Sequence, residues 1–445
     1  MAAALRRSLS PPTTTHHTLN PASLSTAASS SVPNTTAHSG RRRYSSKMAS
    51  APATAAATTS AEPRDGQTCT LPDGRTIGFA EYGAPGGHPV LYFHGFPASR
   101  LEGSITDKQA RRHNVRVLAL DRPGYGLSTR VPERTTMDYP DDVLAFAASQ
   151  NLPRFGILGT SGGGPYALAC ASKIPASRLT HVGILAGAGP WNQEVWKIIP
   201  KRSRIVGFFV RNWPWGLRAF IAGVAGGLQW LARTRPVTRW VDQWLERSVK
   251  EEAEKAAAAK AERQKARADT AEKASAPVDL EASMIGGDYE EVGAASVESL
   301  STTATSPPKP SPGIAAPEAD GEDEDDYDPD DGLTIPERRE KLYRQLFTAF
   351  VQGPDHVIDD ARLFCDDPGY KPEELTFNPI MFWHGDQDAN VPLEWAKPTI
   401  DRIPHSILKV FHGRTHFSIA EDMDEIMSFY DPRMSPNADV HGDDQ

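Results

Sequence analysis

The chain has 445 residues, a formal net charge of -9 and a hydrophobic fraction of 39%. The charge is local, because residues 1–61 carry six basic residues and no acidic one, whereas residues 250–331 carry 22 acidic and eight basic residues. The remaining body is close to neutral and has the length of one large α/β domain with a small attachment. That balance disfavours a nucleic-acid-binding protein, which needs a cationic surface. The three widely spaced cysteines exclude a disulfide framework, and no apolar run reaches the 18 residues of a spanning helix.

The N-terminal segment 1–61 has the composition of a mitochondrial transit peptide, because it is rich in Ser, Thr and Ala and its only charges are basic. Residues 41–46, with the sequence RRRYSS, resemble a matrix-protease cleavage site. A disordered tail would have a similar composition, and Met48 is a possible second start. We therefore expect a mitochondrial protein, with a cytoplasmic form beginning at Met48 as the alternative.

Residues 62–189 read as the first part of an α/β core. Residues 68–82 predict a β-hairpin, because the turn sequence PDG at 72–74 separates two β-rich runs. Short, almost continuously apolar runs predict strands buried on both faces of a parallel sheet, at 89–94, 115–120, 155–159 and 181–186. Helical stretches lie between them at 139–152 and 163–173.

Two more apolar runs of this kind occur late in the chain, at 379–384 and 407–412, within a second part of the core at 371–445. The alternation of strands and helices predicts an α/β fold with a mostly parallel, doubly wound sheet.

The alternation of strands and helices is interrupted between the two parts of the core, so residues 190–370 are predicted to be an insertion. Residues 190–249 read as a helical cap, and residues 336–370, with a helix at 338–351, as its second part. Between them, residues 250–335 read as a charged, solvent-exposed helix at 250–273 followed by an acidic segment. That segment has too few apolar residues to fold on its own.

The first part of the cap contains seven of the nine tryptophans, for which three interpretations stay open. Trp191, Trp196 and Trp213 are candidates for an aromatic roof over an apolar or acyl substrate. Ordinary packing of cap helices on the core would need the same residues. Residues 204–233 also mix apolar residues with arginines, as helices at a membrane surface do.

Ser161 is the candidate nucleophile. It lies in the sequence GTSGG at 159–163, which matches G-x-S-x-G directly after a predicted strand and directly before a predicted helix. The glycines leave room for a tight turn that pushes the serine backbone toward a strained conformation. A glycine-rich turn without chemistry is the alternative reading.

A serine hydroxyl needs a base, and the base needs an acid to orient it. Asp388 and His416 follow the last two predicted strands in the order Ser, Asp, His. Asp386 competes for the acid role, but it lies nearer the strand and is expected to cap the turn. His412 is expected to be structural within its strand, and His384 to be packed or hydrogen-bonded in the core.

Acyl transfer also needs two donors for the developing oxyanion. The candidates are the backbone N–H groups of Gly162, next to the nucleophile, and of Phe96, in the sequence HGFP after the predicted strand 89–94. A simple turn is the alternative reading of HGFP, whose His94 belongs to that motif. The sequence DRPGYGLS at 121–128 is read as loop architecture at the mouth of a pocket.

The motifs HGFP, DRPGYGLS, GTSGG, GDQDANVP and GRTHFS resemble, in this order, those of α/β-hydrolases that carry a helical cap after the sixth strand. The resemblance covers about 68–430 except for roughly 250–335, and it implies the mechanism of a serine hydrolase. For that mechanism we expect no metal or organic cofactor. Epoxide hydrolases and dehalogenases share HGFP but have aspartate where this chain has Ser161.

We therefore predict cleavage of carboxylic esters or thioesters through an acyl-enzyme. The alternatives are a peptidase or acyltransferase with the same triad, or a non-catalytic binding protein on this scaffold. The expected partner is a small apolar or acyl substrate, with peripheral membrane contact through the cap as a further possibility.

Overall fold

The computed structural model describes residues 64–187, 201–275 and 330–433. The predicted transit segment, the start of the cap and most of the acidic insertion lie outside these ranges. The strands are β1 (Gln67–Thr70), β2 (Thr76–Gly83), β3 (His88–Phe93), β4 (Val115–Leu120), β5 (Phe155–Thr160), β6 (Leu179–Leu185), β7 (Ile380–Gly385) and β8 (Ser406–Phe411). The core helices are α1 (Asp107–Arg112), α2 (Tyr139–Ser149), α3 (Gly164–Lys173), α10 (Leu393–Ile400) and α11 (Met423–Ser428). The insertion between β6 and β7 contains α5 (Lys201–Asn212), α6 (Pro214–Ala232), α7 (Arg235–Ser275), α8 (Ile335–Phe347) and α9 (Asp355–Cys365).

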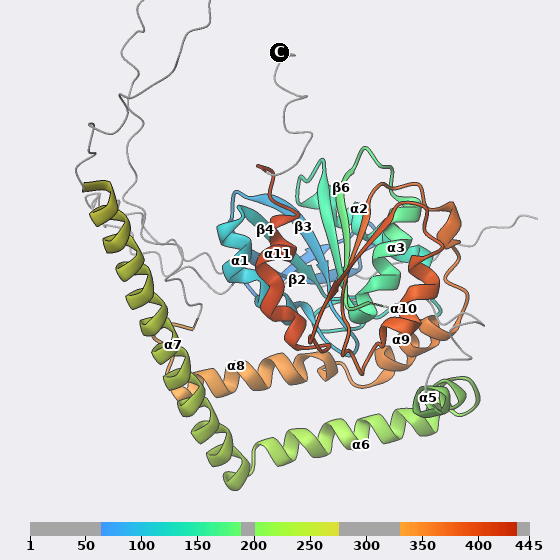
Figure 1. Cartoon of the computed structure of the whole chain (residues 1–445). Helices are drawn as coiled ribbons and strands as arrows, with labels where there is room; N and C mark the ends of the chain where they lie inside the picture. Colours follow the sequence, from blue (N-terminus) through green and yellow to red (C-terminus); the bar gives the residue numbers. More distant parts are fainter. Residues whose placement is uncertain (1–63, 188–200, 276–329, 434–445) are drawn as a thin grey trace, which may run out of the picture. The chain divides into compact units, whose positions relative to one another are not determined.

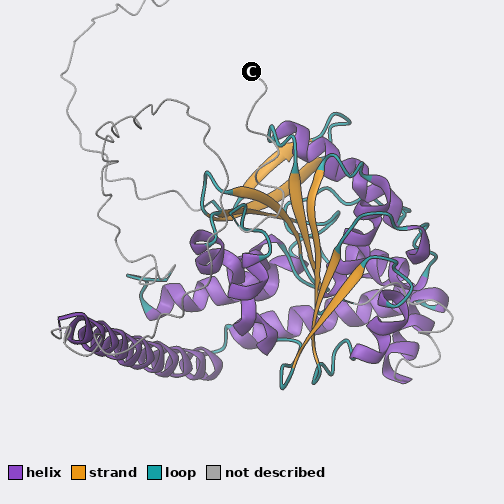
Figure 2. Ribbon diagram, turned by 45° about the horizontal axis from the view of Figure 1, so that its top comes forward, coloured by secondary structure: helices purple, strands orange, loops and turns teal. Residues whose placement is uncertain are grey.

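The eight strands form one sheet in the order β1-β2-β4-β3-β5-β6-β7-β8 (Figures 1 and 2). β1 and β2 are the predicted hairpin, and β2 also pairs antiparallel with β4. Every other pairing is parallel. The predicted α/β fold with a mostly parallel sheet is confirmed.

Alternation along the strands explains why their sequences are continuously apolar. On β3, Leu91 and Phe93 belong to the cluster on one face of the sheet, whereas Val90 and Tyr92 belong to the cluster on the other face. Both faces are covered, so most side chains of the central strands are buried whichever face they point to. The prediction was wrong for β8, where Ile407 is 49% exposed, because β8 is the edge strand and pairs only with β7.

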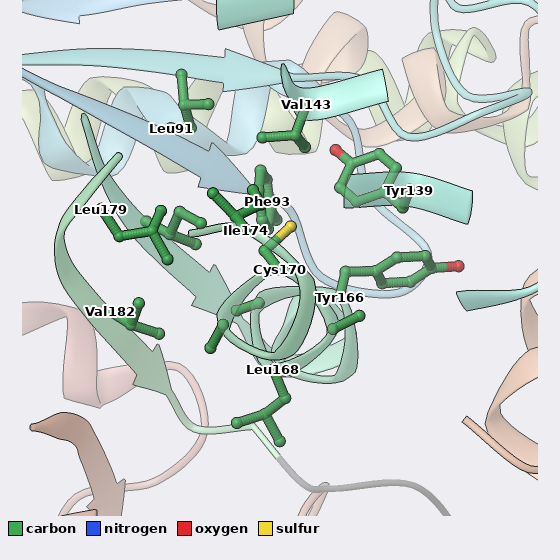
Figure 3. Packing of buried hydrophobic residues seen from close by; sticks show 14 of the residues in the cluster. Leu91, Phe93, Tyr139, Val143, Tyr166, Leu168, Cys170, Ile174, Leu179 and Val182 are labelled. Carbon is green, nitrogen blue, oxygen red and sulfur yellow. The ribbon is translucent and has the colours of Figure 1, made fainter. Parts of the chain in front are cut away.

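Helices cover the sheet on both faces. Residues of α2, α3 and α10 complete the larger cluster, and residues of α1 and α11 complete the other. Figure 3 shows the contact between α3 and the sheet, with Cys170 of the helix beside Phe93 of β3. This packing holds the N-terminal end of α3 against the carboxyl end of β5, where Ser161 lies.

Hydrogen bonds and ion pairs connect the helices of the insertion to one another. Arg218 of α6 pairs with Asp355 of α9 at 2.6 Å, and Arg339 of α8 pairs with Asp242 of α7 at 2.7 Å. The hydroxyl of Tyr343 donates to the Ala232 carbonyl, which joins α8 to the end of α6. The two predicted parts of the cap, before and after the acidic segment, therefore contact each other.

The long helix α7 crosses the predicted boundary between the cap and the charged insertion at 249/250. The alanine-, glutamate- and lysine-rich residues after this point have high helix propensity, so they extend the helix that the cap begins. The predicted charged helix and the last cap helix are thus one element of 41 residues.

The apolar side chains of α6 are not packed into a core, since none of its 19 residues is buried. Trp230 is 71% exposed and Phe220 is 67% exposed. The interpretation of the tryptophans as ordinary core packing is therefore wrong for Trp230, and Trp213, Trp215, Trp240 and Trp244 are exposed as well. None of the helices that the structure describes is long and apolar enough to cross a membrane.

Two histidines in the interior are expected to make the fold sensitive to acid. Burial lowers the pKa of His181 and of His356 to about 4, from an ordinary value of 6.5. Between these pH values the unfolded chain binds protons that the folded chain does not, so the free energy of unfolding falls as the pH falls from about 6.5 to 4. Each histidine contributes a slope of up to about 1.4 kcal/mol per pH unit.

Urea denaturation at several pH values measures this effect. The variant His356→Phe keeps a ring against Tyr125, whose centroid lies 4.2 Å away, but cannot titrate. Its stability should depend less on pH than that of the wild type below pH 6.5. Equal slopes for the two proteins would contradict the assignment.

Candidate active site

Ser161 lies in a sharp turn between β5 and α3. Its backbone φ angle is 50°, in the left-handed region that a non-glycine residue rarely adopts. A Cβ atom on Gly159 would lie 2.7 Å from the Gly163 carbonyl oxygen, and one on Gly163 would lie 2.2 Å from the Phe93 carbonyl oxygen. The flanking glycines are therefore required by close backbone approach, and the turn has the geometry of a nucleophile elbow.

The loop after β3 brings the second candidate oxyanion donor to the same place. A Cβ atom on Gly162 would lie 3.2 Å from the backbone nitrogen of Phe96. The two backbone N–H groups predicted to bind an oxyanion thus belong to adjacent residues in space. The Phe96 ring packs edge-on against Phe364 of α9, with 5.2 Å between ring centroids.

His94 stabilises the loop after β3 through hydrogen bonds made by both of its ring nitrogens. It is completely buried, its Nε2 accepts the Arg122 backbone N–H at 3.1 Å, and its Nδ1 bonds to the Gly95 carbonyl at 2.8 Å. Burial, reinforced by the charge of Arg122, holds the pKa of His94 well below its ordinary value. The ring is therefore neutral, and Nδ1 carries the proton that it donates to Gly95.

Asp388 and His416 are brought together by the loops after β7 and β8. The Nδ1 of His416 lies 2.7 Å from Oδ2 of Asp388, whose carboxylate is buried. The other oxygen of Asp388 accepts the backbone N–H groups of Asn390 and Val391, both at 2.8 Å. The carboxylate is thereby fixed in position, and a proton held on Nδ1 leaves the Nε2 of His416 as the basic nitrogen.

Asp386 has a different role from Asp388, and it is not the predicted cap of its own turn. Its carboxylate accepts the Gly413 backbone N–H at 2.7 Å and bonds to His412 at 3.0 Å, which ties together the loops after β7 and β8. The predicted position of His412 within its strand was wrong, because β8 ends at Phe411 and the His412 side chain is 88% exposed, but its bond to Asp386 fits a structural role. His384 is buried and bonds to the Val391 carbonyl, so its predicted core position is correct.

Glu102 is a site residue that the sequence did not point to. Its carboxylate accepts the Tyr92 hydroxyl at 2.8 Å and the Gly95 N–H at 3.0 Å. A Cβ atom on Gly95 would lie 3.2 Å from Glu102 Oε2 and 3.4 Å from the Ser161 Cβ, so the carboxylate is close to the serine. Burial raises the pKa of Glu102, and the hydrogen bonds from the Tyr92 hydroxyl and the Gly95 N–H oppose that rise. Glu102 therefore accepts the Gly95 N–H and places a carboxylate near Ser161.

Asp360 of α9 is the second residue that sequence reasoning missed. It is completely buried and pairs with both Arg122 and Arg134. The hydroxyls of Tyr125 and Tyr166 donate to it at 2.9 Å and 2.6 Å. Burial alone would raise the pKa of Asp360, but the two guanidinium groups hold it below its ordinary value.

This ionic cluster connects the cap to the loop of Phe96. Arg122 also donates through Nη2 to the Gly95 carbonyl at 2.9 Å. The loop 121–128 therefore holds neighbouring segments in place, as predicted. Its Arg122, however, is fully buried and does not lie at a pocket mouth.

An apolar groove of about 710 Å³ lies between α6, α7 and α8. Its lining includes Leu228 of α6, Trp240 of α7, Leu346 of α8 and, from the core, Pro97. Of the three tryptophans predicted to contact substrate, Trp213 stacks edge-on against Trp215 and is not among the lining residues. Trp191 and Trp196 lie outside the described residues.

The described residues contain no group of three His, Cys, Asp or Glu side chains that could hold a metal ion. The chemistry that the arrangement supports is proton transfer and nucleophilic attack by side chains, assisted by backbone donors.

Residues 88–213 match the family model for the alpha/beta hydrolase fold. The chain is 32% identical over 117 residues to the dihydrolipoyllysine-residue acetyltransferase component of the acetoin cleaving system of Pseudomonas putida, a match that covers 26% of this chain and 31% of that protein. It is 30% identical over 121 residues to a proline iminopeptidase of Arabidopsis thaliana, covering 26% of this chain and 30% of the relative. The chain thus spans about a third of the length of these curated relatives.

Among solved structures, an esterase from Exiguobacterium antarcticum superposes with a TM-score of 0.46 and 14% identity, over 82% of this chain and 97% of that one. The family-model match over residues 88–213 and the mostly parallel eight-stranded sheet together show the alpha/beta hydrolase fold.

Proposed function

We propose that the protein is a serine hydrolase that cleaves carboxylic esters or thioesters through an acyl-enzyme. The observation that carries the proposal is the 2.7 Å hydrogen bond from His416 to the buried Asp388, at the edge of the sheet where Ser161 adopts its left-handed backbone conformation. These residues follow β5, β7 and β8, and the carboxyl ends of parallel strands meet at one edge of a sheet.

In the proposed reaction, the Oγ of Ser161 attacks the substrate carbonyl while the Nε2 of His416 takes its proton. Asp388 keeps the imidazole in the required tautomer and stabilises the imidazolium that forms. The backbone N–H groups of Phe96 and Gly162 bind the oxyanion of the tetrahedral intermediate. The intermediate collapses as His416 protonates the leaving group, and water then releases the acyl group by the same steps.

The same residues would also serve peptide-bond cleavage or transfer of the acyl group to another acceptor, and a binding protein could retain them without turnover. The relatives with acetyltransferase and iminopeptidase names match this chain over too small a share of their length to favour either reaction. Ester, thioester and aminoacyl-anilide substrates, each with and without an alcohol acceptor, distinguish these reactions by their products.

Labelling with a fluorophosphonate probe tests the proposal directly. We expect one modified residue, Ser161, identified by mass spectrometry of peptides from the folded protein. Heat-denatured protein and the variant Ser161→Ala should remain unlabelled. A folded wild-type protein that does not react, as expected of a pure binding module, would contradict the proposal.

A further inference from the structure

The groove between α6, α7 and α8 has a lining suited to one kind of ligand. No charged side chain is found among its described lining residues, and the hydroxyl of Tyr343 is already bonded to the Ala232 carbonyl. Its volume of about 710 Å³ lies within the range of small-molecule binding sites. A ligand that fills this groove would gain binding free energy mainly by burying apolar surface, because its described lining offers no charged side chain.

The side chains that line the groove form an exposed apolar surface, as expected of a binding site. Phe220 of α6, Trp240 of α7 and Leu346 of α8 are each more than half exposed, although they face a common groove. Contiguous apolar surface of this kind marks a binding site in a folded protein.

One end of the groove lies against the loop that carries a candidate oxyanion donor. Pro97 lines the groove and directly follows Phe96, the candidate oxyanion donor. Val357 also lines it and lies on α9, the helix whose Phe364 packs on the Phe96 ring. The groove therefore extends to the loop that carries Phe96 and to the helix that packs on its ring.

The charge around the groove indicates where such a ligand comes from. Residues 201–245 contain eight basic residues and one acidic residue, Asp242. Arg233, Arg235 and Arg239 are exposed at the junction of α6 and α7. Exposed aromatic and aliphatic side chains flanked by arginines are typical of helices that lie in the surface of an anionic bilayer.

We propose that this groove binds the long acyl chain of a lipid ester drawn from an anionic membrane, with the ester carbonyl next to Phe96 and Ser161. The inference rests on the proposed function and names its substrate class. The lining residues Phe220 to Ala232 of α6 extend over about 18 Å of helix, so the groove suits a long chain rather than an acetyl group.

The first experiment measures kcat/KM for soluble esters with acyl chains of four, eight and twelve carbons. For the wild type we expect a rise of up to about fourfold per added methylene, the factor that corresponds to burial of one CH₂ group. The variant Ala225→Trp fills the groove and should lower the ratio of twelve-carbon to four-carbon kcat/KM at least about tenfold. The matched control Ala222→Trp, on the same helix but outside the lining, should keep the wild-type ratio.

The second experiment separates the groove from the chemistry. In the variant Ser161→Ala, a fluorescent long-chain fatty acid should bind, and Ala225→Trp in the same background should abolish that binding. Binding without fluorophosphonate labelling of the wild type would support the groove and contradict the proposed function. Labelling of Ser161 without fatty-acid binding would overturn the groove inference alone.

The third experiment tests the source of the chain. The wild-type protein should float with vesicles that contain phosphatidylserine and less with neutral phosphatidylcholine vesicles, and the difference should shrink at high salt. Failure to float with the anionic vesicles would overturn the membrane part of the inference.

Discussion

Replacing Ser161 by alanine is expected to lower kcat/KM for an ester substrate by about four to six orders of magnitude. The substitution removes the nucleophile and leaves only the contribution of the backbone donors and of substrate binding. His416→Ala should have an effect of similar size, and the double variant little more, because the two residues act as one unit. Steady-state kinetics measures the loss of kcat/KM, and thermal melting checks that each variant is folded.

The chain provides matched controls for this prediction. His412→Ala alters an exposed histidine four residues from His416 and should leave kcat/KM within about twofold of the wild type. Asp388→Asn should cost several orders of magnitude, whereas Asp386→Asn should cost little, since only Asp388 bonds to His416. An equal loss in both aspartate variants would contradict the assignment of the acid.

The substitution Asp360→Asn is expected to lower the free energy of unfolding by about 3–5 kcal/mol. It removes the negative charge that compensates two buried guanidinium groups, those of Arg122 and Arg134, while keeping the size of the side chain. Urea denaturation measures the loss. We also expect lower kcat/KM, because Arg122 holds the Gly95 carbonyl beside Phe96.

The neighbouring residue provides the control for stability. Asp359 pairs with Arg130 at the surface, at 2.7 Å, and such pairs contribute at most about 1 kcal/mol. Asp359→Asn should therefore leave the free energy of unfolding nearly unchanged. Equal losses of unfolding free energy in the two variants would mean that the buried ion pairs of Asp360 stabilise the fold no more than the surface pair of Asp359.

Local patterns predicted most elements of the core. The run 115–120 coincides with β4, and the glycines around Ser161 indicated a turn that the structure forms with a positive φ. Such features depend on residues close together in the chain, whose steric needs are visible in the sequence.

Features that join distant segments were not predictable in this way. Asp360 and Arg122 are separated by 238 positions, and no spacing rule links them. Glu102 lies beside Gly95 only because the helical turn after β3 folds back on the loop. The edge position of β8 and the exposure of His412 likewise follow from which strand pairs with which, not from the composition of residues 407–412.

The sequence alone determined the order of strands and helices, the strained serine turn and the two loops that carry an acid and a histidine, because each is encoded by neighbouring residues. Only the tertiary structure decided the partner of each carboxylate: Asp388, which its loop position favoured, bonds to His416, whereas Asp386 bonds to His412 of the next loop, because these contacts join loops that are distant in the chain. It also decided that α6 exposes its apolar residues along a groove leading to Pro97, because burial of a helix face depends on what packs against it.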